Sequence, residues 1–266
     1  MTNKLSTISQ HFRSNEQPFV KQVDDWIQQS RNEYRSILTR FLNPREQYIL
    51  NVLVNHAADL AVYFNGGVQG AESQRAILIP KEYPQDDLEF EISLLEIKYP
   101  TKFDDLHHST ILGSMMYSGI SRNVIGDILY DQTHSRWQII IDSKMQHYMQ
   151  QMVTKIGHVQ VSLIECDLNN VLPHINDWEE NFLLLSSLRL DTVISAGFDL
   201  SRSGAKKLIE ENQVRVNWSE IAKPDVELAI GDVISVRKHG RVQIKLLDGI
   251  STVSYTHLRA HETTLH

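Results

Sequence analysis

The chain has 266 residues, 41% of them hydrophobic and 22% charged, so it can hold two or three small domains with real cores. Its single cysteine, Cys166, excludes an internal disulfide and a cysteine-rich zinc site, and it suits a reducing cytoplasm. The sequence shows neither the apolar core of a signal peptide nor the roughly 18–20 apolar residues that span a bilayer. We therefore expect a cytoplasmic protein with no membrane partner.

The net charge of −7 argues at first against a nucleic-acid partner, but the charges are unevenly distributed. Residues 185–249 contain 10 Lys and Arg against 9 Asp and Glu, so the excess of acid lies in the rest of the chain. Within this stretch the cations gather at 202–207, at 215 and at 237–241. A local cluster of this kind can bind phosphates on an acidic protein, with modest and salt-sensitive affinity.

Residues 1–80 are predicted to form a helical N-terminal region. Asn43 and Pro44 are typical of a helix cap and a first helical residue, and an apolar stripe at helical spacing follows them. Gly66, Gly67 and Gly70 mark a turn. Because no Gly-Lys-Ser or Gly-Lys-Thr sequence follows, this turn is not predicted to bind a nucleotide.

Residues 81–167 are predicted to form a ferredoxin-like middle domain of the kind that RNA-recognition (RRM) domains share, because their elements follow the order strand-helix-strand-strand-helix-strand. The aromatic strand motif that stacks bases in such domains is missing. No spaced nucleophile, base or metal cluster is present here either, so we predict no catalytic residue, no metal and no cofactor. The predicted elements are strands at 90–98, 127–130, 137–141 and 159–164 and helices at 106–117 and 144–156.

Residues 182–249 are predicted to form a compact C-terminal α+β module after a polar hinge at 167–177. Ser201 is expected to cap a basic helix, Ala205 and Ile209 to lie on its buried stripe, and Asn212 to end it in a left-handed conformation. In the strand that follows, Arg215 alternates with two valines and should face outward. After the Gly231-Asp232 turn, the strand at 233–236 leads into a second group of cations.

This module resembles the S-four domain, also called the αL RNA-binding motif. The resemblance rests on four spaced elements, which read Arg-Leu-Asp at 189–191, Ser-Arg-Ser-Gly-Ala-Lys-Lys-Leu-Ile at 201–209, Val-Arg-Val-Asn at 214–217 and Gly-Asp-Val-Ile at 231–234. Together with Phe-Asn-Gly-Gly at 64–67, Ala71, Glu72, Arg75 and Ile-Gly-Asp-Ile at 125–128, they resemble the bacterial YlmH family. Lys238-His239 departs from that family by replacing a commoner glycine-aromatic pair. Ser73-Gln74 departs from it where basic residues are usual.

The resemblance implies non-catalytic binding of structured RNA, either ribosomal RNA or tRNA, on the large ribosomal subunit in translation or its quality control. Two alternatives stay open: an RNA-modifying enzyme with a catalytic middle domain, and an adaptor of the cell-division machinery. Secondary RNA contacts are expected at Arg75 and Arg122. The main contacts are expected at Arg189, Ser201, Arg202, Ser203, Lys206, Lys207, Arg215, Asn217, Arg237, Lys238 and Arg241.

Three further expectations concern the module and its end. Asp191, in a sequence that pseudouridine synthases use for catalysis, is expected to brace the first helix instead. Trp218 is expected to cover the edge of the core and not to stack on a base. Residues 251–266 show no strand alternation and no resemblance to the family's ending, so we expect an irregular tail that is either truncated or foreign to the native chain.

Overall fold

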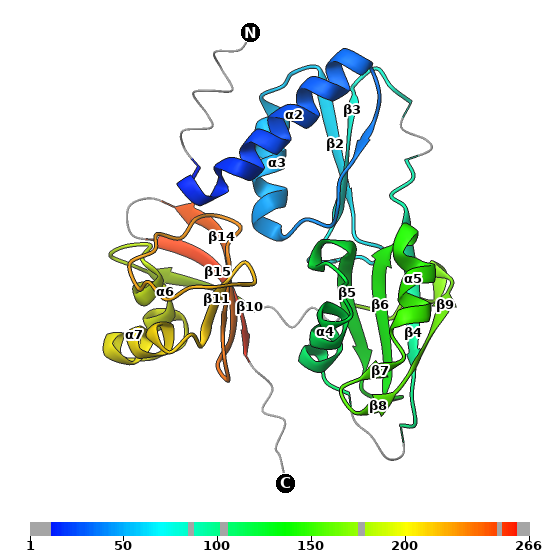
Figure 1. The fold of residues 1–266 in the computed structure, drawn as a ribbon. Helices are drawn as coiled ribbons and strands as arrows, with labels where there is room; N and C mark the ends of the chain where they lie inside the picture. The colour runs from blue at the N-terminus through cyan, green and yellow to red at the C-terminus, as the bar shows by residue number, and fades with distance from the viewer. Residues whose placement is uncertain (1–11, 85–87, 102–105, 175–178, 249–251, 260–266) are drawn as a thin grey trace. The chain divides into compact units, whose positions relative to one another are not determined.

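The computed structural model describes residues 12–84, 88–101, 106–174, 179–248 and 252–259 (Figure 1). The chain divides into two compact units, one of residues 1–43 and 49–175 and the other of residues 44–48 and 176–266. The boundary after residue 175 falls inside the predicted hinge, of which residues 175–177 lie outside the described ranges. Each unit is described by itself.

The N-terminal part of the first unit combines helices with a three-stranded antiparallel sheet in the order β1-β3-β2. The expectation of a helical region was therefore incomplete. Strand β3 is buried along its whole length, and such a continuous apolar run carries no alternation that distinguishes a strand from a helix. The predicted start of a helix at Pro44 is confirmed. The elements are η1 Ser14–Glu16, α2 Gln17–Glu33, β1 Ile37–Leu38, α3 Pro44–Asn55 (of which residues 44–48 are counted with the second unit), β2 Leu60–Asn65 and β3 Arg75–Pro80.

The middle part of this unit is a four-stranded antiparallel sheet in the order β5-β6-β4-β9. Helices α4 and α5 pack on one of its faces over a core that includes Leu95, Ile111, Ile139 and Met149. The predicted second helix is shorter than expected, because residues 155–160 form a small hairpin of β7 and β8. The elements are β4 Ile92–Lys98, α4 His108–Tyr117, η2 Arg122–Val124, β5 Ile125–Asp131, β6 Arg136–Asp142, η3 Ser143–Met145, α5 Gln146–Met152, β7 Lys155–Ile156, β8 Val159–Gln160, β9 Ser162–Cys166 and η4 Leu168–Asn170.

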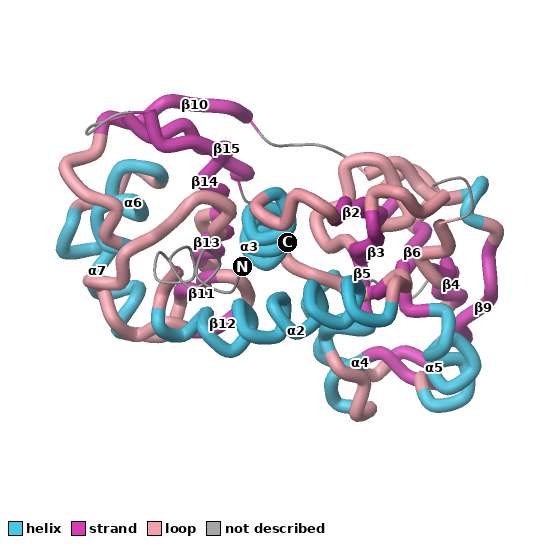
Figure 2. The backbone as a smooth tube through the Cα atoms, turned by 90° about the horizontal axis from the view of Figure 1, so that it is seen from above, coloured by secondary structure: helices cyan, strands magenta, loops and turns pink. Residues whose placement is uncertain are grey.

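The second unit contains a six-stranded sheet in the order β10-β15-β14-β13-β11-β12, with α6 and α7 beside it (Figure 2). One apolar core joins the two helices to alternate residues of the strands, among them Ala205, Val214, Ile234 and Val242. The elements are β10 Glu179–Leu184, α6 Leu190–Gly197, α7 Arg202–Glu210, β11 Val214–Val216, β12 Ser219–Glu220, β13 Val233–Val236, β14 Gly240–Asp248 and β15 Thr252–Arg259.

The tail differs from the expectation of irregular structure over part of its length. Residues 252–259 form strand β15, which pairs antiparallel with β14 on one side and with β10 on the other. Strand pairing uses backbone groups, so it does not require the side-chain alternation that the sequence lacks here. Residues 260–266 lie outside the described ranges.

Candidate nucleic-acid interface

Asp191 lies in the first turn of α6. Its side chain is fully buried, yet two arginines reach it. Arg189 Nε lies 3.2 Å from Oδ1, and Arg202 Nε lies 3.6 Å from Oδ2. Burial by itself would raise the pKa of this carboxyl, but the hydrogen bond from Arg189 and the charges of both arginines hold the pKa below its ordinary value. Asp191 therefore carries a negative charge that braces the start of α6, as expected from the sequence, and also links α6 to α7 through Arg202, which was not expected.

The basic helix begins and ends where the sequence predicted. Ser201 Oγ accepts a hydrogen bond of 3.1 Å from the Gly204 backbone N–H, and the helix starts at Arg202. Asn212 adopts a left-handed φ of 56° directly after the helix. Between these two ends, Ala205 and Ile209 are buried, so the side of α7 that contains them faces the core.

The remaining side of α7 is open. Ser201, Ser203, Lys206 and Lys207 are exposed, and the Lys207 ammonium lies 3.9 Å from Glu211 in the following turn. The Arg202 side chain is 54% exposed, although it also donates to the Thr192 hydroxyl at 3.1 Å. Arg202, Lys206 and Lys207 are hereafter the helix cations. Residues 200–209 themselves contain no Asp or Glu, although Asp191 lies beside Arg202 and Glu211 beside Lys207.

A second basic group lies on the sheet. Strand β13 pairs with β11 and β14, so Ser235 is opposite Arg215 on one side and Arg241 on the other. Directly opposite residues in a sheet point to the same face, so the two arginines flank Ser235. Arg237 lies beside them, with Nη1 3.4 Å from Gln213 Oε1. Arg215, Arg237 and Arg241 are hereafter the sheet arginines.

Glu220 weakens one of these arginines as a phosphate ligand. It lies opposite Arg215 on the edge strand β12, and its Oε1 is 2.9 Å from Arg215 Nη2. Both side chains are more than half exposed. A bound phosphate would have to compete with this carboxylate for the guanidinium.

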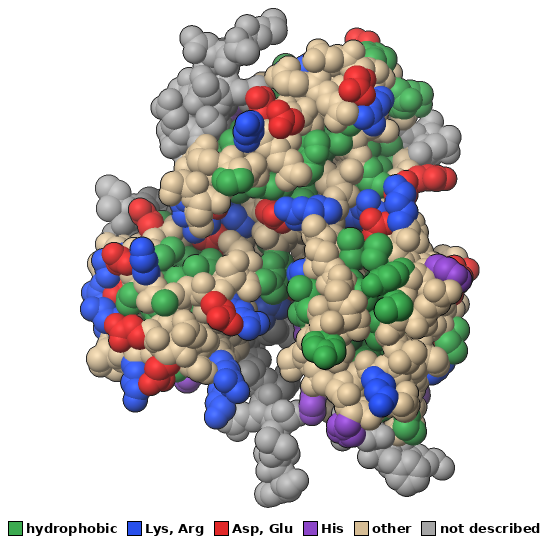
Figure 3. All heavy atoms as spheres, viewed as in Figure 1, with side chains coloured by type: hydrophobic (Ala, Val, Ile, Leu, Met, Phe, Trp, Pro, Cys, Tyr) green, Lys and Arg blue, Asp and Glu red, His purple; other side chains and the backbone are tan. Residues whose placement is uncertain are grey.

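The helix cations and the sheet arginines lie on opposite faces of the sheet. Val214 and Val216 pack into the core with the helices, so Arg215 between them points away from α6 and α7. Strand alternation therefore divides the RNA contacts expected from the sequence between the two sides of the sheet. Residues 211–213 connect α7, which holds the helix cations, to β11, which holds Arg215. Gln213 in this connection contacts Arg237. Basic and acidic side chains are interspersed on the visible face of this unit (Figure 3).

Lys238 is at the tip of the loop between β13 and β14, with an exposed side chain and a left-handed φ of 66°. A glycine adopts this conformation without steric cost, and most other residues do not. Lysine in place of the family's glycine thus adds a positive charge at a position where the backbone conformation favours glycine. The neighbouring His239 ring contacts Phe198 edge-on at 6.2 Å.

Asn217 has a structural task that the sequence alone did not reveal. Its amide nitrogen donates to Asp232 Oδ1 at 2.8 Å, and its amide oxygen accepts from the Val233 N–H at 3.0 Å. Asp232 is fully buried and also accepts from the Ala229 N–H. This side chain joins the end of β11 to the start of β13, so Asn217 is better explained as a brace than as an RNA ligand. Trp218 beside it is half-buried, and its assignment to the core edge stays a prediction.

The two predicted secondary contacts belong to the first unit and are held inside it. Arg75 is buried, and its guanidinium donates to the carbonyls of Thr39 and Glu91 at 2.8 Å each. Its Nη1 also lies 3.2 Å from Asp142. Arg75 thus ties three segments together and has no exposed surface to offer RNA. Arg122 is half-buried and donates to the Ile125 carbonyl, which leaves its RNA contact as a prediction.

Asp127 joins two sequence motifs of the first unit that lie about 50 residues apart. Its carboxylate accepts the backbone N–H groups of Glu72 at 2.7 Å and Ser73 at 3.0 Å. Burial raises the pKa of this carboxyl, and the nearby Glu72 adds to the effect. His174 Nε2 lies 3.7 Å from the same carboxylate. Motif residues 71–75 and 125–128 therefore form one internal junction.

Two models of known protein families match this chain, one over the middle domain and one over the C-terminal module. Residues 188–234 match the family model of the S4 domain, and residues 84–170 match the model described as "Putative RNA-binding domain in YlmH". "Ribosome-associated protein quality control protein P2" of Bacillus subtilis (strain 168) is 34% identical over 245 residues, which cover 92% of this chain and 94% of that protein. The chain belongs to the YlmH family. The family resemblance read from the sequence motifs is confirmed.

Two further relatives are similar to parts of this YlmH protein. "Cell division protein ylmH from Streptococcus pneumoniae" has a solved structure with a TM-score of 0.52 and 34% identity, covering 61% of this chain and 97% of that chain. Small ribosomal subunit protein uS4 of Leptothrix cholodnii is 37% identical over 71 residues, which are 26% of this chain and 34% of that protein. The second match is limited to a short segment, as expected for a shared domain.

The described part of this YlmH protein contains neither a membrane-spanning helix nor a metal cluster. None of its described helices is both long and apolar enough to cross a bilayer. Within the same residues, no group of three or more His, Cys, Asp or Glu side chains is arranged to hold a metal ion.

Proposed function

We propose that this YlmH protein binds structured RNA, either ribosomal RNA or tRNA, without catalysing a reaction on it. The observation that carries the proposal is the exposed side of α7, where three cations follow a capped helix start and no carboxylate lies within residues 200–209. Cations beside a helix start are well placed for backbone phosphates, whereas base edges require more specific groups. The fixed positions of Arg189 and Arg202 on Asp191 reduce the entropy cost of such contacts.

The site is proposed to consist of the helix cations, Ser201, Ser203, Arg189 and the sheet arginines with Lys238. The helix cations form its principal part, because Glu220 already occupies Arg215. An irregular folded backbone can reach both faces of a small module, which a regular single strand does less readily. This favours folded RNA over an unstructured strand.

We also propose the large ribosomal subunit as the place of binding and the cytoplasm as the compartment. The relative in Bacillus subtilis is named as a ribosome-associated quality control protein, and this chain covers 94% of it. The middle domain is proposed to be ferredoxin-like, because its first, second, third and fourth strands are ordered 2-3-1-4 with both helices on one face.

The absence of catalysis is part of the proposal. One polar cluster of the first unit includes Asp127, Glu72 and His174, and Asp127 already accepts two backbone N–H groups. The contacts of Asp127 are thus explained by a structural role, which is to join two segments of the chain. Purified protein incubated with bulk cellular RNA should leave the nucleoside composition unchanged by mass spectrometry. A new modified nucleoside that disappears in an Asp127→Asn variant would overturn the non-catalytic assignment.

Crosslinking in living cells tests the proposed partner. The tagged full-length protein is irradiated, purified under denaturing conditions, and its attached RNA is sequenced. We expect the reads to concentrate on ribosomal RNA of the large subunit or on tRNA, and to fall in a variant that lacks the helix cations. Reads spread evenly over messenger RNA would contradict the proposal.

One other candidate function rests on the name of the Streptococcus pneumoniae relative, a cell division protein. An adaptor of the division machinery should co-purify with division proteins after nuclease treatment. A partner set that is lost with nuclease favours RNA binding instead.

A further inference from the structure

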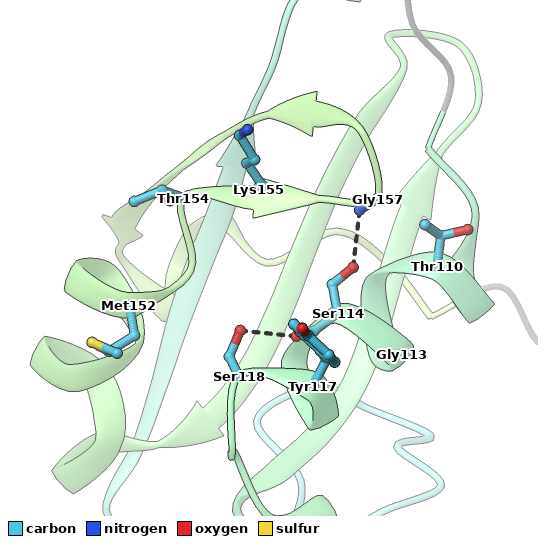
Figure 4. A pocket seen from close by; sticks show the side chains of 9 residues that line it. All are labelled: Thr110, Gly113, Ser114, Tyr117, Ser118, Met152, Thr154, Lys155 and Gly157. Carbon is cyan, nitrogen blue, oxygen red and sulfur yellow. Dashed lines mark hydrogen bonds between the residues drawn. The ribbon is translucent and has the colours of Figure 1, made fainter.

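The helical layer of the middle domain contains a groove of about 550 Å³ between α4 and the β7–β8 hairpin, with the end of α5 at one side (Figure 4). One face of α4 forms its floor, because Thr110, Gly113, Ser114, Tyr117 and Ser118 recur at helical spacing. The opposite face of the same helix is the core face, where Ile111 and Met115 are fully buried. The groove is thus separate from the packing of the domain.

Hydrogen bonds hold the walls of the groove in place. Ser114 Oγ accepts the Gly157 N–H at 3.0 Å and so joins α4 to the hairpin. Ser118 Oγ donates to the Ser114 carbonyl at 2.9 Å within α4. Gly113 has open space where a side chain would be. These small residues leave the floor open next to one large side chain.

That large side chain is Tyr117, which is 96% exposed at the end of α4. Met152 at the end of α5 is 53% exposed on the other side of the groove. In Figure 3, hydrophobic side chains gather over the same part of this domain. Exposing an aromatic ring to this extent brings no packing energy, so the ring is available for a ligand.

The charge around the groove is unlike that of the rest of the domain. Residues 84–170 contain 6 Lys and Arg against 12 Asp and Glu. None of those carboxylates lies in residues 106–126 or 143–164, which supply both helices and the hairpin. Lys155 lines the groove itself, and its side chain is exposed. The groove thus presents an aromatic ring, hydroxyls and a cation, and none of the residues that line it is acidic.

The other face of the sheet is covered by other parts of the chain and is not exposed to a ligand. Leu94, Leu129 and Ile140 are buried there under Phe41 and Leu172. The Leu172 N–H donates to Gln138 Oε1 at 2.7 Å, which fixes this cover on strand β6. A base that stacks on this domain has an exposed aromatic partner on the helical side.

We propose that this groove binds an unpaired nucleotide of RNA, with the base stacked on Tyr117 beside Met152 and the phosphate near Lys155. The inference rests on the proposed RNA-binding function and assigns to it a second contact, outside the S-four domain. Stacking of this kind tolerates any base, and a hydroxyl-lined floor can accept different base edges. The middle domain would thus hold a flexible loop or end of an RNA whose folded part binds elsewhere.

The test uses full-length protein in which the helix cations are replaced by Ala, so that the groove dominates what remains. The probe is a fluorescent oligoadenosine of about ten nucleotides, within the range of such sites. Tyr117→Ala should weaken its binding roughly five- to a hundredfold, and Tyr117→Phe should stay within about twofold. Lys155→Gln should lower the slope of log affinity against log salt by about 0.7. Tyr83→Ala, at another exposed tyrosine, is the control and should change nothing.

Ultraviolet crosslinking of the same probe to the wild-type chain should place a nucleotide adduct on the peptide that contains Tyr117. Equal affinities of Tyr117→Ala, Tyr117→Phe and Tyr83→Ala, with no such adduct, would overturn the inference. So would a Tyr117→Ala variant that keeps its RNA affinity but loses a protein partner, because the groove would then be a protein-docking site. Failure of the S-four proposal is seen separately, as unchanged binding of ribosomal RNA when the helix cations alone are removed.

Discussion

Asp191 of α6 and Arg202 of α7 form an ion pair in which the carboxylate is fully buried and the guanidinium is half-exposed, with 3.6 Å between Oδ2 and Nε. Arg189 approaches the other oxygen from the start of α6. One buried charge therefore fixes the two arginines that lead the proposed RNA surface. The first prediction follows from this relationship.

Asp191→Asn should lower the free energy of unfolding by about 1–3 kcal/mol, because the amide leaves two guanidinium partners less well satisfied. The pKa of Asp191 is lowered in the folded protein, so its stabilising effect is present above its unfolded pKa of about 3.9 and is lost as the pH falls through the lower folded value. Chemical denaturation at pH 7 and below pH 4 measures this. A variant as stable as the wild type at pH 7 would show that the pair contributes nothing.

The second prediction separates charge from structure on α7. Lys206→Ala with Lys207→Ala leaves the Asp191 pair intact and should weaken binding of ribosomal RNA while lowering the salt slope by about two, roughly one for each lost phosphate contact. Filter binding between low and physiological salt gives both quantities. The matched control is Lys21→Ala with Lys81→Ala, two exposed lysines of the first unit, which should match the wild type. The same loss in both double variants would indicate nonspecific attraction.

The third prediction concerns the competition at Arg215. Glu220→Gln removes the carboxylate that lies 2.9 Å from this guanidinium, so RNA affinity should rise a few-fold if Arg215 contacts RNA. Stability should barely change, since both side chains are more than half exposed. Arg215→Ala is the companion variant and should reduce affinity. If Glu220→Gln binds RNA no better than wild type, the sheet face is not part of the interface.

A fourth prediction addresses the left-handed Lys238. Lys238→Gly should stabilise the protein by roughly 0.5–1 kcal/mol, because glycine adopts φ 66° without a Cβ penalty. The same change removes one cation, so the salt slope of RNA binding should fall by about one if Lys238 contacts a phosphate. Thermal melting and salt titration report the two effects independently. Lys238→Ala, which loses the charge but keeps the Cβ, should lower the slope without gaining stability.

Local patterns predicted much of the second unit. Ser201 as cap, Asn212 as helix end and Arg215 as an outward residue each depend on neighbours in the sequence, and each was correct. The structural roles of Asn217 and Arg75 depend on partners far along the chain, Asp232 and Glu91 among them. Those partners are unknown until the fold is known, which explains why both residues were placed among the RNA ligands.

Two other differences have a similar origin. Strand β3 reads as an apolar run without alternation because it is buried on both faces. The division between helix cations and sheet arginines follows from strand alternation, which the sequence did show for Arg215. What the sequence lacked was the side of the sheet on which α7 packs. The groove at Tyr117 was also missed, since its lining comes from three separate elements.

A competition experiment tests the central claim, recognition of folded RNA by the S-four surface, most directly. Labelled large-subunit ribosomal RNA is bound to the full-length protein at moderate salt and displaced either with unlabelled ribosomal RNA or with poly-uridine at equal nucleotide concentration. The account predicts that ribosomal RNA displaces the label at a clearly lower concentration than poly-uridine, and that this preference shrinks when the helix cations are removed. Equal displacement by both competitors would contradict it, because the surface would then respond to phosphate charge alone.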